Sequence, residues 1–335
     1  MAWFKSPPPS VSPTAEVGVL VMNLGTPEAP TYGAIRRYLG QFLGDLRVVE
    51  ACPYYWYLIL FGPILTFRPL KTARLYRSIW GEHGSPLKTH TEALVAGLQQ
   101  SLGASVAVEM AMTYGKPSVA SALERLLARD IKTLYVLPLY PQYSGSTTGA
   151  SFDALVNAMK RYRVVPSLRF VSEYHDHDVY IEALAQSVKD QWAKTGRTHL
   201  VISNHGIPVK YVDQGDPYKR QVERTASALV NALGLASTEV SLTYQSRFGP
   251  TEWLTPATDD ELKRLAHAGV KKVTVITPSF AVDCLETLEE IAIGSAEAFA
   301  EAGGESLVVV PALNASAAHV RVLRSVLARE GLTVG

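Results

Sequence analysis

The chain has 335 residues, of which 47% are hydrophobic, and a formal net charge of +1. This length suits two domains of ordinary size, and the near-neutral charge excludes the basic surplus of a nucleic-acid-binding protein. Two cysteines, Cys52 and Cys284, are too few for a disulfide framework or for a four-cysteine zinc or iron–sulfur site within one chain. We therefore expect a protein of a reducing compartment.

The first fifteen residues are rich in proline and contain no apolar run long enough for a secretory signal. We interpret residues 1–15 as a flexible, extended tail. The segment that follows, LVMNLGTP (20–27), places Asn-x-Gly-x-Pro after a short apolar run. The same motif returns in ISNHGIP (202–208), where His205 replaces the Leu24 of the first copy.

Short apolar runs alternate with amphipathic segments along the whole chain. Such alternation predicts parallel sheets with helices on both faces. Helices are expected in segments such as 118–130 and 258–269. The candidate strands are 18–22, 106–112, 133–139, 168–173, 199–203, 240–244, 272–277 and 307–311.

The two halves of the chain also resemble each other, as in AMTYGKP (111–117) and SLTYQSRFGP (241–250). An internal duplication explains this likeness. The predicted fold class is α/β, with two similar doubly wound domains whose parallel four-stranded sheets face a central cleft. The expected divisions are a first domain at 16–165, a second domain at 166–312, and a C-terminal helix and tail at 313–335.

The segment 47–90 has no counterpart in the second half and contains the most hydrophobic run, YYWYLILFGPILTF (54–67). This run is too short to span a bilayer and is interrupted by Gly62-Pro63. We interpret the insert as a hydrophobic lip beside the cleft, and the alternative is a pair of helices buried in the core. An apolar surface bordered by cations suits a flat apolar ligand with carboxylate tails, or an anionic membrane. The bordering cations are Arg68, Lys71, Arg74 and Arg77.

Two features can carry chemistry. A lone histidine is often structural, but His205 lies at the carboxyl end of a predicted strand, where ligands of such sheets bind. In PSFAVDCLETLEEI (278–291) a helix is expected to begin near Asp283, with Glu286 and Glu290 on one face. A solvated acidic face is the alternative. A row of carboxylates can relay protons or cations, and an imidazole facing it suits a borderline divalent metal.

The loop YPQYSGSTTG (140–149) fits either an anion-binding loop or the ordinary capping of a helix by serine and threonine. The sequence contains no Walker A motif, no Gly-x-Gly-x-x-Gly after a strand, no His-Glu-x-x-His and no Gly-x-Ser-x-Gly nucleophile elbow.

Three segments together closely resemble the ferrochelatases, the terminal enzymes of haem synthesis: SNHGIPVKYVDQGDPY (203–218), TYQSRFGPTEWLTPATDD (243–260) and 278–291. LVMNLGTPEAP and YPQYSGSTTGAS resemble them too, in the same order, so the likeness covers most of 17–315. The sequences of these segments are similar to those of the Gram-negative bacterial branch of the family. The resemblance implies insertion of Fe²⁺ into protoporphyrin IX with release of two protons. The alternatives are a coproporphyrin III ferrochelatase, a cobalt chelatase, or a non-catalytic two-lobed carrier of haem or metal.

The resemblance also implies roles for single residues. His205 matches the family's histidine, taken as a metal ligand or as the acceptor of pyrrole protons, and Glu286 matches the carboxylate across the porphyrin. Asp283 and Glu290 are its acidic neighbours in a proton or metal relay. The implied porphyrin contacts are Leu24, Tyr76, Arg77, Lys88, Tyr114, Tyr140 and Trp253.

Two positions depart from the family pattern. Cys284 stands where many ferrochelatases have a second histidine, and Thr113 stands where animal enzymes place an arginine. We expect no permanently bound cofactor, Fe²⁺ as a substrate, and no iron–sulfur cluster of the kind that some relatives carry. The expected protein is a cytoplasmic monomer or weak dimer, with peripheral contact to the inner membrane through residues 54–67 and no nucleic-acid partner.

Overall fold

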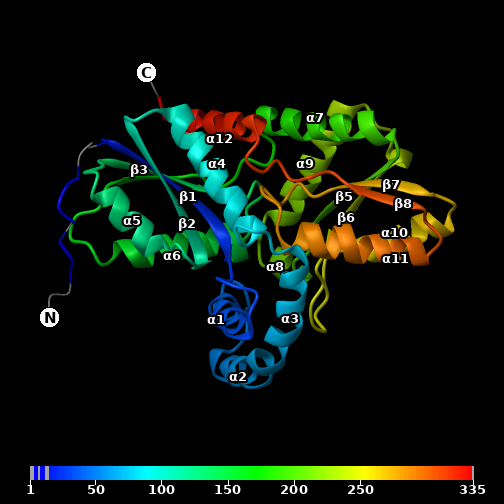
Figure 1. The fold of residues 1–335 in the computed structure, drawn as a ribbon, viewed down its shortest axis with the longest axis horizontal. Coiled ribbons are helices and arrows are strands. Elements are labelled where there is room, and N and C mark those ends of the chain that lie inside the picture. The colour runs from blue at the N-terminus through cyan, green and yellow to red at the C-terminus, as the bar shows by residue number, and fades with distance from the viewer. Residues whose placement is uncertain (1–3, 7, 12–14, 334–335) are drawn as a thin grey trace. The chain divides into compact units, whose positions relative to one another are not determined.

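The computed structural model describes residues 4–6, 8–11 and 15–333, and the chain divides into two compact units (Figure 1). Each unit contains one four-stranded sheet in which every pairing is parallel. The predicted α/β class with two four-stranded parallel sheets is confirmed, and the central cleft stays a prediction. The first unit comprises residues 1–140, 144–172 and 315–335, and the second comprises 141–143 and 173–314.

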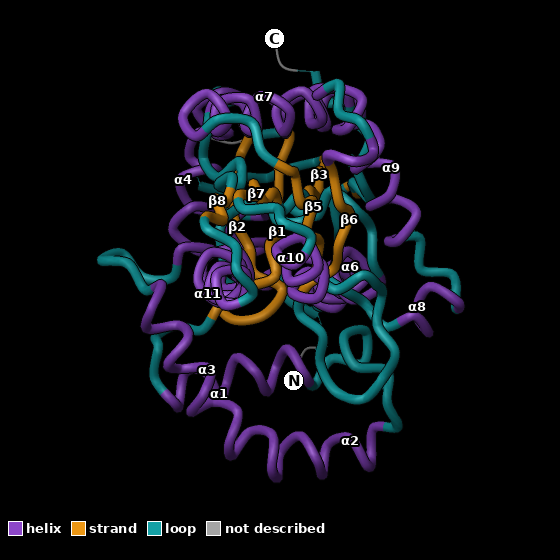
Figure 2. The backbone as a smooth tube through the Cα atoms, turned by 90° about the vertical axis from the view of Figure 1, so that its right-hand side faces the viewer, coloured by secondary structure: helices purple, strands orange, loops and turns teal. Residues whose placement is uncertain are grey.

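The first unit orders its strands β2-β1-β3-β4, and helices cover both faces of the sheet (Figure 2). The central strand β1 is buried along most of its length because its run of Val, Leu and Met side chains faces helices on both sides. The strands are β1 (Val17–Thr26), β2 (Val106–Gly115), β3 (Thr133–Pro138) and β4 (Ser167–Phe170). The helices are α1 (Tyr32–Leu43), α2 (Pro53–Ile59), η1 (Leu60–Ile64), α3 (Leu65–Ile79), α4 (Pro86–Leu102), α5 (Val119–Leu127), η2 (Gly145–Gly149), α6 (Ala150–Met159) and α12 (Ala317–Arg329).

The second unit repeats this order as β6-β5-β7-β8. Its core packs Val201, Val273 and Val275 of the sheet against Leu262 and Ile291 of the covering helices. The strands are β5 (His199–His205), β6 (Val240–Gln245), β7 (Lys272–Ile276) and β8 (Ser306–Val309). The helices are α7 (Asp178–Thr195), α8 (Val209–Asp213), α9 (Tyr218–Leu233), η3 (Ser237–Glu239), α10 (Thr258–His267), η4 (Glu286–Ser295) and α11 (Ala296–Glu301).

The repeated Asn-x-Gly-x-Pro motif has the same structural reason in both units. Gly25 follows Asn23 with φ +117°, and a Cβ there would lie 1.8 Å from the carbonyl oxygen of Tyr114 on the neighbouring strand. At Gly206 the backbone N–H donates to the carbonyl of Gln245 at 2.8 Å, and a Cβ would lie 2.9 Å from that oxygen. Both glycines therefore admit a close approach by the next strand at the carboxyl end of the sheet.

The boundary between the units differs from the predicted division at residues 165 and 166. Strand β4 pairs with β3 and so completes the first sheet, which moves the boundary to residues 172 and 173. The C-terminal helix α12 is not a separate appendage, because it packs on α4 of the first unit. Both β4 and α12 lie next to the second unit in the sequence, so the sequence alone did not assign them to the first unit.

The predicted tail at 1–15 lies partly outside the described residues. Those that the structure describes follow the first unit: the backbone N–H of Lys5 donates to Arg161, that of Val11 to Ala128, and that of Ala15 to Arg129. The described part of the tail is therefore anchored rather than free.

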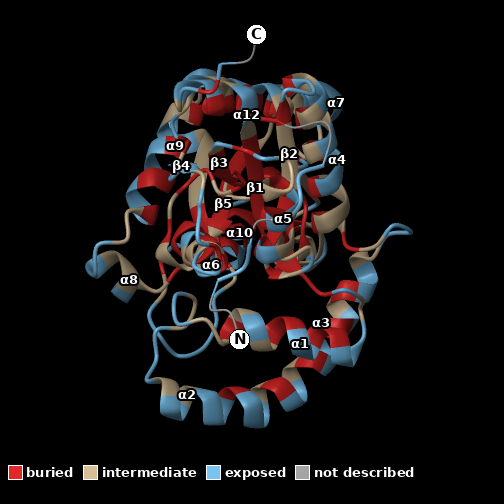
Figure 3. Cartoon of the chain, turned by 90° about the vertical axis from the view of Figure 1, so that its left-hand side faces the viewer, coloured by how far each residue is buried: buried red, intermediate tan, exposed pale blue. Residues whose placement is uncertain are grey.

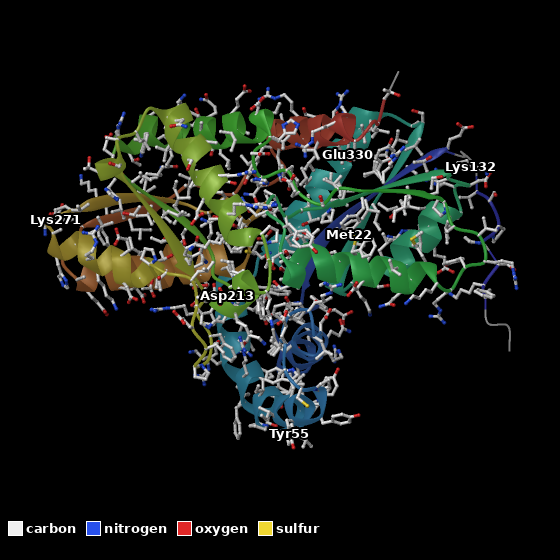
Figure 4. All side chains as sticks on the ribbon, turned by 180° about the vertical axis from the view of Figure 1, so that it is seen from behind. Met22, Tyr55, Lys132, Asp213, Lys271 and Glu330 are labelled. Carbon is white, nitrogen blue, oxygen red and sulfur yellow. The ribbon has the colours of Figure 1, made fainter. Side chains whose placement is uncertain are left out.

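The insert forms helices α2, η1 and α3, and many of its residues are coloured as exposed in Figure 3, whereas Leu60 and Leu65 are buried. Tyr54, Leu58 and Phe67 are 85%, 74% and 69% exposed. Figure 4 shows Tyr55 at the end of the insert away from its sheet. The alternative of a helix pair buried in the core is therefore wrong for this run. Among the described residues, no helix combines the length and apolarity that crossing a membrane requires.

The side chain of Gln99 covers the beginning of the edge strand β2, and further along the strand the N–H of Met112 donates to the carbonyl of Pro117 at 2.8 Å. The Gln99 amide donates to the carbonyl of Val106 at 2.9 Å, and its oxygen accepts from the N–H of Val108 at 2.9 Å. These are outward-facing backbone groups that a further strand would otherwise pair.

Candidate active site

His205 is the last residue of β5, and its side chain is half-buried at the carboxyl end of the second sheet. Its Nδ1 lies 2.6 Å from the carbonyl oxygen of Gly206. A carbonyl can only accept a hydrogen bond, so Nδ1 must carry the proton and Nε2 keeps its lone pair in the neutral ring. The Phe280 ring, with its centroid 6.4 Å away, provides an apolar neighbour. His205 is thus prepared to accept a proton or to bind a metal through Nε2.

The acidic helix η4 is a π-helix that begins at Glu286, not the α-helix beginning near Asp283 that the sequence suggested. Its hydrogen bonds join residues five apart. Helices of this kind are rare overall, and those that occur are frequently found at functional sites. Glu286 and Glu290 remain about one turn apart, and both are half-buried. The carbonyl of Glu286 accepts a hydrogen bond from Gln245 at 2.9 Å, which ties the start of the helix to the end of β6.

Glu290 is the carboxyl whose environment is most specific. Ser246 donates to it twice, from its backbone N–H at 2.7 Å and from its hydroxyl at 2.5 Å. Burial raises the pKa of Glu290, the Ser246 hydroxyl and, when its ring is protonated, His205 lower it, and the neighbouring Glu286 raises it again. The net direction is upward, so this carboxyl holds its proton more tightly than an exposed glutamate.

Asp283 lies before the helix, and both of its carboxylate oxygens are used within the second unit. One accepts from the Thr287 hydroxyl at 2.9 Å and the other from the Asn314 amide at 2.7 Å. The side chain is buried, so it fixes the segment from which Glu286 projects. Its expected role in a relay stays a prediction.

Within the described part of the chain, His205 and Glu286 belong to no group of three metal-ligating side chains whose ligand atoms lie within 4.8 Å of one another.

Trp253, a predicted porphyrin contact, pairs with Pro208 through the backbone and donates its indole N–H to the carbonyl of Phe248. It lies over Gly206, because a Cβ at that glycine would be 3.3 Å from the ring.

The first unit has a cavity of about 640 Å³ beside the predicted contact Tyr114, a volume in the range of small-molecule sites. Tyr57 and Phe61 of the insert form part of its wall. The Tyr114 hydroxyl donates to Asp45 at 2.8 Å, and burial, followed by this carboxylate, raises the pKa of the phenol far above its usual value.

The remaining predicted porphyrin contacts do not line this cavity. Leu24 is half-buried, Tyr76 is buried against the edge of Trp80, and Arg77 is exposed on α3. Lys88 makes an ion pair of 3.6 Å with Glu92 on α4. Burial raises the pKa of Tyr140, so its phenol stays protonated to higher pH than an exposed tyrosine.

The sequence profile of the ferrochelatase family matches residues 16–330 of the chain. This chain belongs to the ferrochelatase family. A ferrochelatase of Nitrosococcus oceani is 50% identical over 313 residues, which cover 92% of this chain and 85% of that protein. A ferrochelatase of Pseudoalteromonas atlantica is 46% identical over 317 residues, covering 93% and 88% of the two chains.

Solved structures with the same fold are far more distant in sequence. The sirohydrochlorin chelatase SirB of Bacillus subtilis subspecies spizizenii has a TM-score of 0.56 at 11% identity, covering 94% of this chain and 95% of that one. CbiX, named as the terminal enzyme of sirohaem biosynthesis in denitrifying bacteria, has a TM-score of 0.53 at 14% identity, covering 94% and 100%. These two structures support the two-domain α/β fold and nothing finer.

The two departures from the ferrochelatase pattern have clear environments. Cys284 is buried, and burial together with Glu286 raises the pKa of its thiol well above the usual value, which favours an inert thiol over a metal-binding thiolate. The Thr113 hydroxyl lies 2.9 Å from that of Ser151 and lines the cavity beside Tyr114. Any cation that binds a porphyrin carboxylate must come from elsewhere.

Sequence reasoning missed two residues that this ferrochelatase uses to hold its acidic helix. Gln245 and Ser246 both bind the helix, and Ser246 has a left-handed backbone with φ 65°. A non-glycine residue with this φ is uncommon and often lies at a functional site. The segment TYQSRFGP contains both residues, but no periodicity there indicates a bond to residue 290.

Proposed function

We propose that this protein is a protoporphyrin ferrochelatase, which inserts Fe²⁺ into protoporphyrin IX and releases two protons. Family membership supports the reaction, and the observation that carries it at the residue level is the imidazole of His205. Its Nδ1 proton is fixed by the Gly206 carbonyl, so Nε2 is the available base. The reaction requires such a base near pH 7, because two pyrrole protons must leave as the metal enters.

The acidic helix would take part in removing protons or delivering metal. Glu286 projects from its first turn, and Glu290 has a raised pKa that brings its proton affinity closer to neutral pH. A carboxyl of this kind can accept a proton and pass it on, which an ordinary exposed glutamate does poorly near pH 7. Asp283 would hold the helix start while Glu286 and Glu290 exchange protons or metal.

The porphyrin would be held by the family positions that the sequence identifies: Leu24, Tyr76, Arg77, Lys88, Tyr114, Tyr140 and Trp253. Arg77 is exposed and Lys88 is half-exposed, so both can reach propionate carboxylates. The cavity beside Tyr114 has a mixed lining, with the rings of Tyr57 and Phe61 beside the carboxylates of Asp45 and Asp153. The preference for protoporphyrin over the more heavily carboxylated coproporphyrin therefore rests on the exposed apolar side chains of the insert, such as Tyr54, Leu58 and Phe67.

The exposed apolar run of residues 54–67 supports peripheral membrane contact by a cytoplasmic protein. We further propose that the protein acts as a monomer or weak dimer, without a resident cofactor or iron–sulfur cluster. Binding to vesicles of anionic lipid tests the membrane contact. Replacing Tyr54, Leu58 and Phe67 together by serine should abolish it, whereas unchanged binding would exclude this surface.

The decisive test replaces His205 by alanine and follows porphyrin absorbance after anaerobic addition of Fe²⁺ or Zn²⁺. We expect turnover to fall by roughly 100- to 10,000-fold, the range of a lost general base, with porphyrin binding retained. The matched control is His267→Ala, because His267 is an exposed histidine at the end of α10. Normal turnover in His205→Ala would refute the assigned base.

The same assay separates the alternatives. Faster metal insertion into coproporphyrin III than into protoporphyrin IX would reassign the substrate. Tight porphyrin binding with no insertion of any metal would indicate a carrier. Preferential insertion of Co²⁺ into a corrin precursor would indicate a cobalt chelatase.

A further inference from the structure

A second group of metal-ligating side chains lies in the loop between β4 and α7. Glu173, His175 and Asp176 place their ligand atoms within 4.8 Å of one another, all within the second unit. His175 is only 3% exposed, Glu173 is half-buried, and Asp176 is exposed. The loop thus has a buried imidazole with a carboxylate that reaches water.

The Glu173 carboxylate fixes the tautomer of this imidazole. It is hydrogen-bonded to His175 Nδ1, and a carboxylate accepts, so Nδ1 carries the proton and the Nε2 lone pair is left available. Nε2 is buried and has no hydrogen-bond partner among the described residues. A carboxylate that orients a histidine from behind in this way is the usual outer support of a metal-binding imidazole.

The Asp176 carboxylate lies 3.6 Å from His175 Nε2. This distance exceeds that of an ordinary N–H···O hydrogen bond, about 2.7–3.2 Å. Two ligands bound at roughly 2.0–2.2 Å by one tetrahedral ion are about 3.4 Å apart, which is close to the observed separation. A cation bound between this lone pair and the carboxylate would satisfy both groups.

The loop is held firmly before any ligand binds. The His175 carbonyl accepts from the Thr225 hydroxyl at 2.8 Å, and the N–H of Tyr174 donates to Pro141 at 2.9 Å. Tyr174 is fully buried and packs edge-on against Tyr180, with 5.6 Å between ring centroids. The imidazole is therefore positioned by its surroundings, and binding would cost little ordering of the loop.

We propose that this protein has a second divalent-cation site, formed by His175 Nε2 and the Asp176 carboxylate, with Glu173 as the positioning residue. One nitrogen and one oxygen ligand select a borderline ion such as Co²⁺, Zn²⁺ or Fe²⁺. Water completes the coordination from the exposed side of Asp176. The site lies on a different segment from His205 and Glu286, and it does not depend on the proposed porphyrin chemistry.

The competing arrangement is a protonated His175 held between two carboxylates, in which case no metal binds. Titrating the protein with Co²⁺ separates the two, with bound metal measured by equilibrium dialysis and by its visible absorption. The full-length His205→Ala variant is the background, because it removes the nitrogen ligand of the proposed chelation site. We expect one Co²⁺ equivalent in this background that depends on His175.

The variants define the site. Asp176→Asn, at an exposed position, should weaken the Co²⁺ equivalent at least tenfold, and Glu173→Gln by roughly 10- to 100-fold, as expected for a supporting carboxylate. The matched control is Asp178→Asn, an exposed acid two residues further along, which should leave binding unchanged. If His175→Gln fails to fold, the Asp176→Asn result still decides. Equal Co²⁺ binding with and without the Asp176 carboxylate, or no binding in the His205→Ala background, would overturn the proposal.

Discussion

Replacing Ser246 by alanine isolates one interaction of the buried carboxyl Glu290. The change deletes the hydroxyl that donates at 2.5 Å and keeps the backbone N–H that donates at 2.7 Å. A hydrogen bond to a charged acceptor contributes about 1.5–3 kcal/mol, and its loss leaves the ionised carboxylate less well stabilised. Since about 1.4 kcal/mol corresponds to tenfold, the proton affinity of Glu290 should rise roughly ten- to a hundredfold.

The assay is the pH dependence of kcat for metal insertion, which reports groups in the enzyme–substrate complex. If Glu290 must be ionised to pass a proton, the acid limb should move to higher pH in Ser246→Ala. Turnover near neutral pH should fall about tenfold and recover at more alkaline pH. The control is Ser227→Ala, which removes an exposed hydroxyl bonded within α9. A profile that superimposes on that of the unmodified protein would refute the link from Ser246 through Glu290 to proton transfer.

Two further predictions concern stability. The pKa of Glu290 is raised in the folded state, so its ionised form opposes folding and stability falls as pH rises through that pKa. The free energy of unfolding of Glu290→Gln, measured relative to that of the unmodified protein, should therefore increase as pH rises from about 4.3 to alkaline values. If urea unfolding gives the same difference between the two proteins at acidic and at alkaline pH, the pKa shift is contradicted. Gly25→Ala should lose about 3 kcal/mol or more, because its Cβ would lie 1.8 Å from the Tyr114 carbonyl oxygen at φ +117°. Its control is Gly33→Ala in the first turn of α1, where the nearest atom is 3.7 Å away, and comparable losses at both positions would contradict the steric argument.

The parts of the fold that follow from local patterns were predictable from the sequence. Strand–helix alternation and the repeated Asn-x-Gly-x-Pro motif lead directly to two four-stranded parallel sheets, with His205 at the end of β5. The exposed apolar surface of residues 54–67 was indicated because the insert has no counterpart in the second half and its apolar run is too short to span a bilayer. In each case the prediction depends only on residues that are close together in the sequence.

Features that depend on distant contacts were not predictable in the same way. Strand β4 belongs to the first sheet through its pairing with β3, which no local pattern records. The π-helix at Glu286 has the composition of an α-helix, and its register is set by bonds to Gln245 and Ser246. The supporting role of Asp283 likewise rests on Asn314, which is distant along the chain.

The side chain of Gln99 has a consequence for the behaviour of the protein in concentrated solution. Strand β2 is long and lies at the border of its sheet, so its unpaired backbone groups could recruit a strand from another molecule. The glutamine amide bonds both Val106 and Val108, and so it makes the hydrogen bonds that a neighbouring strand would otherwise make. One residue on a covering helix thereby blocks strand addition at this end of the border, where charge or proline gives the protection in many other sheets.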